Sequence, residues 1–278
     1  IMKIKYYNAF ENISNSQYHK EKFRLQIELL KLQEWILKNN KRVAILVEGR
    51  DAAGKGSAIQ RIVENLMTKH YRVVEIGKPT KKQNKAWFKT YEKTLPKDGE
   101  LVFYDRSWYS RAMIQPTMGY CSVEQYKYFM RKVYKWEKRL IKDGLILIKI
   151  YLSVDKPTQR RRFHIRKNHL LKYWKLSKND LLSLSSWDTY TFFKNRMFVM
   201  SAKKKSPWIV INANNKMTAR LNALRYVLDS MDYDGKKNLK VKSWNLDQDR
   251  DKIEVLDVLF DNLNKEQYQL LNNIKQIL

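Results

Sequence analysis

The stretch EGRDAAGKGSAI, residues 48–59, has the residue types and spacing of a phosphate-binding loop. Gly49, Gly54 and Lys55 keep the G-x-x-x-x-G-K pattern, in which backbone N–H groups cradle phosphate oxygens and the lysine reaches a terminal phosphate. The next residue is Gly56, where nucleotide-hydrolysing proteins with this loop carry a Ser or Thr hydroxyl that binds magnesium. The pattern predicts phosphate chemistry with the metal held elsewhere, and an ordinary tight turn between strand and helix is the structural alternative.

Two aspartates are placed to hold that metal. Asp51 lies within the loop, and Asp105 follows the apolar run LVFY at the end of another expected strand. Magnesium in phosphate sites is bound by one or two carboxylates together with substrate oxygens and water. We therefore expect Asp51 and Asp105 to bind Mg²⁺, or Mn²⁺ in its place, and Asp51 also to orient the attacking phosphate. A helix cap or a turn is the alternative role for each acid.

Two arginines follow the second of these acids in the stretch RSWYSRAM. Arg106 and Arg111 could grip phosphoryl oxygens and neutralise the charge that builds up during phosphoryl transfer. A surface ion pair, or packing of a guanidinium on Trp108, is the alternative. The catalytic candidates are Asp51, Lys55, Asp105, Arg106 and Arg111.

A strongly basic helical segment covers about residues 156–206 and contains the run TQRRRFHIRKNHLLKYWK. It follows the fourth expected strand, where kinases with a phosphate loop place a lid that closes over phosphate, so we favour a lid over a merely solvated charged face. On a helix, Arg162 and Arg166 share one side. The phosphate-binding candidates are Gly49, Gly54, Lys55, Gly56, Ser57, Lys69, Arg162, Arg166 and Lys175.

The elements that must position these residues alternate along the chain. Five short apolar runs, each typical of a buried parallel strand, are separated by helical patterns. These runs are residues 43–49, 71–77, 100–105, 145–152 and 207–213. The alternation predicts an α/β fold with a doubly wound, parallel five-stranded sheet and functional groups at the carboxyl ends of its strands. An amphipathic helix over 19–39 precedes the sheet.

The domain organisation follows from the same reading. We expect a kinase domain over residues 1–231, including the lid, and a C-terminal helical extension over 232–278. The extension is expected to be helical because its stretch DKIEVLDVLFDNLNKEQYQLLNNI has periodically spaced apolar residues.

The amino-acid composition indicates which kind of partner the protein binds and in which cellular compartment it is expected. The chain has 278 residues with a formal net charge of +28, which predicts a strongly polyanionic partner. The single cysteine, Cys121, excludes an intrachain disulfide and favours a reducing cytoplasm. No apolar run approaches the roughly 18 residues that cross a bilayer, and the first residues lack the apolar core of a signal peptide, so we expect a cytoplasmic protein without membrane partners. The histidine spacing does not favour zinc, and no serine–histidine pair favours a nucleophilic triad.

Taken together, these stretches resemble the polyphosphate kinase 2 family over about residues 10–230. The matching stretches are GRDAAGKG (49–56), GKPT (77–80), YDRSWYSRA (104–112), MGY (118–120), RRFHIR (161–166), KYWKLS (172–177), WDTY (187–190), SPWIVINANNK (206–216) and ARLN (219–222). The resemblance implies a thymidylate-kinase-like P-loop kinase fold and magnesium-dependent transfer of phosphoryl groups between inorganic polyphosphate and nucleoside mono-, di- or triphosphates. It also implies a homo-oligomer, either a tetramer or a dimer.

The chain departs from the family pattern at a few positions. Thr90 stands where the family usually has Arg, Gln115 where it has Glu, and Asn168-His169 where it has Asp-Pro. The loss of a negative charge at Gln115 leaves open whether the acceptor is a nucleoside mono- or diphosphate.

The sequence leaves three functions open. The favoured one is a reversible polyphosphate-dependent kinase that forms ATP or GTP from ADP or GDP. A P-loop ATPase that binds nucleic acid would use the basic surface, but Gly56 and the absence of a DNA-binding pattern weigh against it. A nucleotide kinase with ATP as the donor would leave the excess positive charge without a purpose.

Overall fold

The computed structural model describes residues 4–236, 251–256, 258–263 and 265–277. The chain divides into two compact units, Ile1–Lys237 and Asn238–Leu278. The strands of the first unit are β1 (Ile4–Tyr6), β2 (Arg42–Gly49), β3 (Tyr71–Val74), β4 (Glu100–Asp105), β5 (Leu145–Ser153) and β6 (Trp208–Asn212). Its α-helices are α1 (Asn15–Lys38), α2 (Lys55–Val63), α3 (Lys81–Lys85), α4 (Trp87–Glu92), α5 (Ile114–Thr117), α6 (Val123–Lys142), α7 (Lys156–Asn168), α8 (Lys178–Ser185), α9 (Trp187–Ser201) and α10 (Lys216–Asp229). Short 3₁₀ helices are η1 (Thr68–His70), η2 (Trp108–Arg111) and η3 (Tyr173–Lys175).

The six strands of this unit form one parallel sheet in the order β1-β6-β5-β2-β4-β3. The central strand β2 has seven buried residues out of eight, which explains its uninterrupted apolar run. Its neighbours bring their carboxyl ends to the same edge, because Val47 pairs with Asp105 of β4 and Gly49 pairs with Leu152 of β5. This edge is where a loop leaving β2 can meet groups from adjacent strands.

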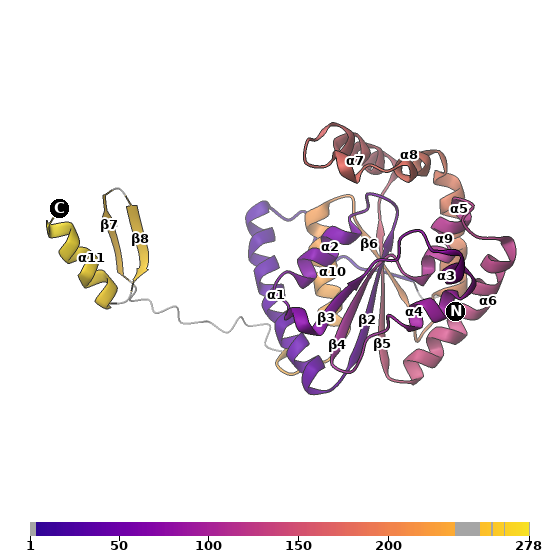
Figure 1. Cartoon of the computed structure of the whole chain (residues 1–278), viewed down its shortest axis with the longest axis horizontal. Coiled ribbons are helices and arrows are strands. Elements are labelled where there is room, and N and C mark those ends of the chain that lie inside the picture. The colour runs from indigo at the N-terminus through magenta and orange to yellow at the C-terminus, as the bar shows by residue number, and fades with distance from the viewer. Residues whose placement is uncertain (1–3, 237–250, 257, 264, 278) are drawn as a thin grey trace. The chain divides into compact units, whose positions relative to one another are not determined.

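Two apolar layers hold helices against the two faces of the sheet. Val43, Ile45 and Val47 of β2 pack into the layer under α1, α2 and α10, whereas Ala44 and Leu46 pack into the layer under α4, α6 and α9. Figure 1 shows these helix sets on opposite sides of the sheet, with α7 and α8 together at its top. The α/β doubly wound arrangement predicted from the strand and helix pattern is confirmed.

A charged network is buried in the second apolar layer. Lys149 of β5 and Glu137 of α6 form an ion pair with 3.0 Å between Nζ and Oε2, and both side chains are fully buried. Glu137 also accepts hydrogen bonds from Trp108 Nε1 at 2.9 Å and from Ser206 Oγ at 2.8 Å. Because Trp108 begins η2, this network fixes the segment that follows β4.

The prediction of five strands is one strand short. All five expected strands are present, and β1 adds a sixth at the sheet edge by pairing with β6. A three-residue edge strand has too few positions to show a periodic pattern, and Tyr6 on it is 84% exposed.

The prediction of a wholly helical C-terminal extension is wrong. The second unit contains an antiparallel hairpin, β7 (Asp251–Val255) and β8 (Val258–Leu263), followed by α11 (Lys265–Ile277). Ile253 and Val255 are buried while Glu254 between them is exposed, which is the alternation of a strand. Only the last part of the expected helix is helical.

Candidate active site

The phosphate loop begins where β2 ends against β5. Gly49 has φ +151°, and a Cβ there would lie 2.5 Å from the carbonyl oxygen of Leu152. A larger residue at this position would therefore separate the two strands, and glycine is required for the chain to turn out of the sheet. At the other end of the loop, Gly54 has φ +103° and precedes the first residue of α2.

The loop and α2 together present donors to an anion. The amides of the first turn of an α-helix have no partner within the helix, and among the described residues no side chain caps the N-terminus of α2. The helix dipole adds positive potential at the same place. Lys55 is buried, and its Nζ lies 3.1 Å from Gly49 O and 3.2 Å from Arg50 O. Burial lowers the pKa of Lys55, Arg106 lowers it further, and the nearby Asp105 and Asp51 oppose that shift.

Asp105 explains why residue 56 is a glycine. A Cβ added to Gly56 would lie 2.9 Å from Asp105 Oδ2, closer than real Cβ atoms come to other atoms. The Asp105 carboxylate thus stands directly against the first turn of α2, where a Ser or Thr side chain would have to fit. The acid and the hydroxyl cannot both occupy this position without a shift.

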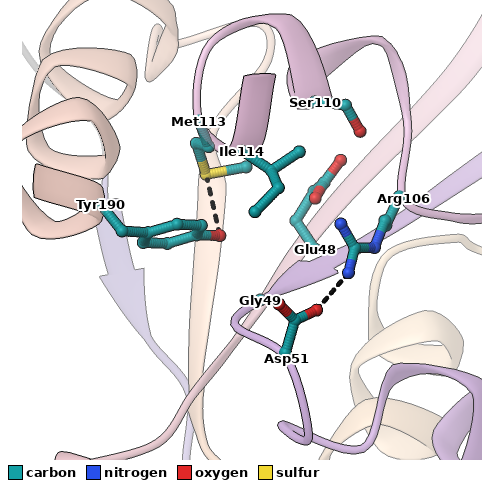
Figure 2. A pocket seen from close by; sticks show the side chains of 8 residues that line it. All are labelled: Glu48, Gly49, Asp51, Arg106, Ser110, Met113, Ile114 and Tyr190. Carbon is teal, nitrogen blue, oxygen red and sulfur yellow. Dashed lines mark hydrogen bonds and ion pairs between the residues drawn. The ribbon is translucent and has the colours of Figure 1, made fainter. Parts of the chain in front are cut away.

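A second acid, Asp51, pairs with Arg106 across the loop. Arg106 Nη2 donates to Asp51 Oδ1, and Figure 2 shows this ion pair beside the carboxylate of Glu48. The Asp51 side chain is nearly buried, whereas Arg106 is 30% exposed. Arg106 has a left-handed backbone with φ +64°, uncommon for a non-glycine residue, which turns the chain sharply after β4. Tyr190 of α9 closes the other side of the same pocket.

Glu48 is a site residue that the sequence reasoning missed. It is 2% exposed and accepts hydrogen bonds from Ser107 N at 2.6 Å and from Ser107 Oγ at 2.7 Å. Burial raises the pKa of Glu48 above its ordinary value, while the hydrogen bonds from Ser107 and the charges of Lys55 and Arg106 oppose that rise. An acid in the last positions of an otherwise apolar strand was the signal that could have identified it.

Arg111 is turned into the protein rather than towards the Asp51–Arg106 pair. Its guanidinium lies over the ring of Trp87 at 4.6 Å and donates from Nη2 to Asn84 O at 3.0 Å and Asn84 Oδ1 at 2.5 Å. The residue is 2% exposed, and Nε has no hydrogen-bond partner among the described residues. The packing alternative considered for the arginines of this segment therefore describes Arg111, with Trp87 in place of Trp108.

The basic residues of the expected lid have different surroundings. Arg162 of α7 is buried against the backbone of the phosphate loop, so it is not a free cation facing solvent. Arg166 forms an ion pair with Asp180 of α8 at 3.1 Å. Lys175 lies in η3 with its Nζ 5.0 Å from the ring centroid of the exposed Trp174.

The remaining two phosphate-binding candidates are not equivalent. Ser57 Oγ donates to Gly54 O at 2.9 Å within the first turn of α2. Lys69 lies in η1, directly before β3, and therefore at the amino ends of the parallel strands. The phosphate loop follows β2 at the opposite edge of the sheet, so the structure does not bring Lys69 to the loop, and phosphate binding by Lys69 stays a prediction.

The acids at the loop fit a hard divalent cation. Across the described part of the chain, no group of three or more His, Cys, Asp or Glu side chains is arranged to hold a metal. Two aspartates, Asp51 and Asp105, nevertheless lie close enough to Lys55 to affect its pKa, and Asp105 abuts the helix turn that would contact phosphate. Two carboxylates with the remaining positions left to phosphate oxygens and water match the chemistry of magnesium.

The arrangement defines a class of protein. A central parallel strand, a G-x-x-x-x-G-K loop, an α-helix with open amides and an acid at the end of the adjacent strand are the parts of a P-loop kinase. In the residues that the structure covers, we find no helix with the length and apolar character needed to traverse a bilayer.

Comparison with known proteins identifies the family. The family model described as polyphosphate kinase 2 matches residues 12–239. The chain belongs to the polyphosphate kinase 2 family, whose members are phosphotransferase enzymes, and this confirms the resemblance found in the motifs. The chain is 45% identical over 227 residues to a GDP-polyphosphate phosphotransferase of Mycolicibacterium smegmatis, covering 81% of this chain and 80% of that protein. It is 40% identical over 227 residues to ADP-polyphosphate phosphotransferase 1 of Rhizobium meliloti, covering 81% and 76%.

A solved structure supports the fold. The crystal structure of polyphosphate kinase 2 from Arthrobacter aurescens matches with a TM-score of 0.70 and 23% sequence identity, over 84% of this chain and 89% of that chain. The family match ends at residue 239, so β7, β8 and α11 lie outside it.

Proposed function

We propose that this protein catalyses the magnesium-dependent, reversible transfer of phosphoryl groups between inorganic polyphosphate and nucleotides. The main reaction is the formation of ATP or GTP from ADP or GDP, with AMP as a further acceptor. Family membership and the names of the two relatives support polyphosphate and nucleoside diphosphates as substrates. The observation that carries the proposal is the position of Asp105 against Gly56, which replaces the metal-binding hydroxyl of a P-loop ATPase by a carboxylate.

Each charged residue at the loop has a part in this reaction. The amides at the start of α2 and the Lys55 ammonium bind the oxygens of a terminal phosphate. Asp51 and Asp105 would hold Mg²⁺, which neutralises phosphate charge when bound. Arg106, paired with Asp51, lies where a guanidinium can stabilise charge on the transferred group. Both substrates contain phosphoanhydride bonds, so the chain mainly positions reactants in line and neutralises charge.

The oligomeric state and the cellular location are part of the same proposal. A homo-oligomer, either a tetramer or a dimer, follows from the family resemblance and is measured by light scattering of the purified protein. A cytoplasmic location is consistent with a single cysteine in the sequence.

One assay separates the proposed reaction from its rivals. The protein is mixed with magnesium, ADP and long-chain polyphosphate, and ATP is measured over time, with GDP and AMP as parallel acceptors. We expect ATP and GTP to form only when polyphosphate is present. Failure to form either, together with ATP hydrolysis that DNA stimulates, would refute the proposal in favour of a nucleic-acid-dependent ATPase.

An aspartate variant tests the site within that assay. Asp105→Asn changes the charge at the loop with almost no change in volume, so the fold should be retained while turnover is lost. Circular dichroism and the melting temperature verify the fold. Retained turnover would remove Asp105 from the metal site.

A further inference from the structure

The carbonyl groups of the phosphate loop are held from outside by side chains. Lys55 Nζ bonds to the first two of them, Gly49 O and Arg50 O. The next three are bonded by residues of α7. Gln159 Nε2 donates to Asp51 O at 2.8 Å, and Arg162 Nη1 donates to Ala52 O at 2.9 Å and to Ala53 O at 3.1 Å. Five consecutive carbonyls, residues 49–53, therefore have side-chain donors.

The two residues of α7 are built into the protein interior. Gln159 is fully buried and Arg162 is 5% exposed. The second terminal nitrogen of Arg162, Nη2, donates to Ala213 O at 2.5 Å and to Asn214 O at 3.2 Å, in the segment that follows β6. One guanidinium thus joins the phosphate loop to a second loop at the same edge of the sheet.

The hydrogen bonds of Arg162 to backbone carbonyls use the N–H groups that would otherwise bind a phosphate. Each terminal nitrogen of a guanidinium carries two N–H groups, and the four bonds of Arg162 engage both nitrogens twice. A guanidinium that binds four backbone carbonyls has only its Nε–H left to offer a substrate. The sequence-based assignment of Arg162 as a phosphate ligand is therefore replaced by a role towards the loop itself.

Fixing the carbonyls also fixes the amides. In a trans peptide the C=O of one residue and the N–H of the next point in opposite directions. When the carbonyls of Asp51, Ala52 and Ala53 are held towards α7, the N–H groups of the next residues are directed away from it. The N–H of Ala53 donates to Arg50 O at 3.1 Å within the loop, which leaves those of Ala52 and Gly54 for a ligand. Ala52 adopts φ +60°, a left-handed conformation that is costly for alanine and needs support from its surroundings.

We propose that Gln159 and Arg162, named here the α7 brace, are positioning residues that hold the carbonyls of the phosphate loop outward so that the amides of Ala52 and Gly54 are preset for phosphate. The proposal rests on the proposed function in taking this loop as the phosphate site. It also gives α7, the first helix of the expected lid, a direct mechanical connection to the loop that the lid would cover.

Gln159→Met is the most informative variant. Methionine has a similar length and no charge, so the substitution removes the bond to Asp51 O without removing any attraction for phosphate. Loss of a buried hydrogen bond that leaves its acceptor unpaired corresponds to about a tenfold effect. Arg162→Lys keeps the charge but cannot reach four carbonyls. Arg161→Ala is the matched control, because Arg161 is the neighbouring, exposed arginine of the same helix.

Two measurements decide the role of the brace. The first is hydrogen exchange of the amides of residues 50–56 in the full-length protein without substrate. The second is the affinity for inorganic tripolyphosphate as a function of salt concentration, alongside kcat and KM for polyphosphate. A residue that contacts phosphate changes the slope of log affinity against log salt by about one unit, whereas a positioning residue weakens binding with the slope unchanged.

We expect Gln159→Met and Arg162→Lys to exchange their loop amides faster and to bind tripolyphosphate about tenfold more weakly, with wild-type salt slopes and a melting temperature that stays above the assay temperature. Arg161→Ala should leave loop exchange unchanged. Wild-type exchange in both brace variants would overturn the proposal, and so would a salt slope lowered by one unit when Arg162 is replaced by a neutral Met. If the wild-type protein does not bind tripolyphosphate, the proposed function fails, but the exchange measurement still decides whether the brace holds the loop.

Discussion

Replacing Gly56 by alanine should separate activity from stability. The new Cβ would lie 2.9 Å from Asp105 Oδ2, so one of the two groups must move. The Asp105 carboxylate is the end of a short, partly exposed side chain, and it can rotate away from the helix at little cost. Residue 56 is the second residue of α2, where alanine is favoured over glycine by up to about 1 kcal/mol. The free energy of unfolding should therefore stay the same or rise slightly.

The activity should respond in the opposite direction. Magnesium requires near-ideal geometry, so a carboxylate rotated out of place no longer serves as a ligand. Disturbing groups that only support metal ligands already lowers metal affinity or activity by about 10–100-fold. We expect Gly56→Ala to raise the magnesium concentration for half-maximal ATP formation by at least about tenfold. Gly56→Ser should behave similarly, because serine carries the same Cβ.

The assay is a magnesium titration of ATP formation from ADP and polyphosphate, with urea unfolding measured on the same samples. Gly77→Ala is the matched control, since no described atom lies within 4 Å of a Cβ at that glycine. A Gly56→Ala protein with wild-type turnover and magnesium dependence would refute the reasoning. So would a parallel loss of stability and activity, because the collision would then disturb the helix rather than the carboxylate.

Three further predictions concern the surroundings of the loop. Lys149→Ala should lower the free energy of unfolding in urea by about 3–5 kcal/mol, because it leaves Glu137 buried without its cation, and a loss below 1 kcal/mol would contradict this. The raised pKa of Glu48 means that the folded protein binds more protons than the unfolded chain between pH 4.5 and the folded pKa, so stability falls as pH rises through that window. Glu48→Gln should make the free energy of unfolding less dependent on pH there, and an unchanged slope would argue against the shift. The Arg50 guanidinium lies 3.5 Å from the ring centroid of Trp187, so Arg50→Ala and Trp187→Leu should show a coupling of about 1 kcal/mol or more in a double-mutant cycle, and strictly additive losses would exclude the contact.

The sequence was most informative where local pattern and tertiary position agree. The strand β2 is apolar over residues 43–47 because both of its faces are covered, and Gly49 and Gly54 have positive φ angles that other residues do not adopt easily. Asp105 could be assigned to the same sheet edge because parallel strands end together. The apolar run and the glycines depend on rules that act within a few residues, whereas the position of Asp105 depends on the common direction of neighbouring strands.

The C-terminal segment shows the limit of that approach. Apolar residues in IEVLDVLF satisfy a helical period and a strand alternation at once, and short runs of this kind are ambiguous. The pairing of Val255 with Val258 settles the matter through contacts between residues that the pattern treats as one helix face. The spacing of apolar residues along a sequence does not show which strands pair with each other.

The direction of long side chains was equally inaccessible. Arg111 and Arg162 have the same formal charge as Arg106, yet one lies over Trp87 and the other binds backbone carbonyls. A charged residue in a basic run carries no sign of which partner it reaches after folding. Backbone carbonyls of a folded loop, which a sequence pattern does not reveal, compete with phosphate for the N–H donors of these arginines.

The charge balance at the loop gives the replacement of a hydroxyl by an acid a physical consequence. Glu48, Asp51 and Asp105 meet Arg50, Lys55 and Arg106, so these six groups carry no net charge when all are ionised. The carboxylates of Asp51 and Asp105 would repel a phosphate chain unless a divalent cation lay between them and the phosphate, whereas a neutral Ser or Thr ligand would create no such repulsion. We therefore expect the proposed cation and the phosphate to raise each other's affinity by the same factor. A loop built this way should hold phosphate firmly with the cation and release it readily without it, which suits an enzyme that must let the same polymer go after each transfer.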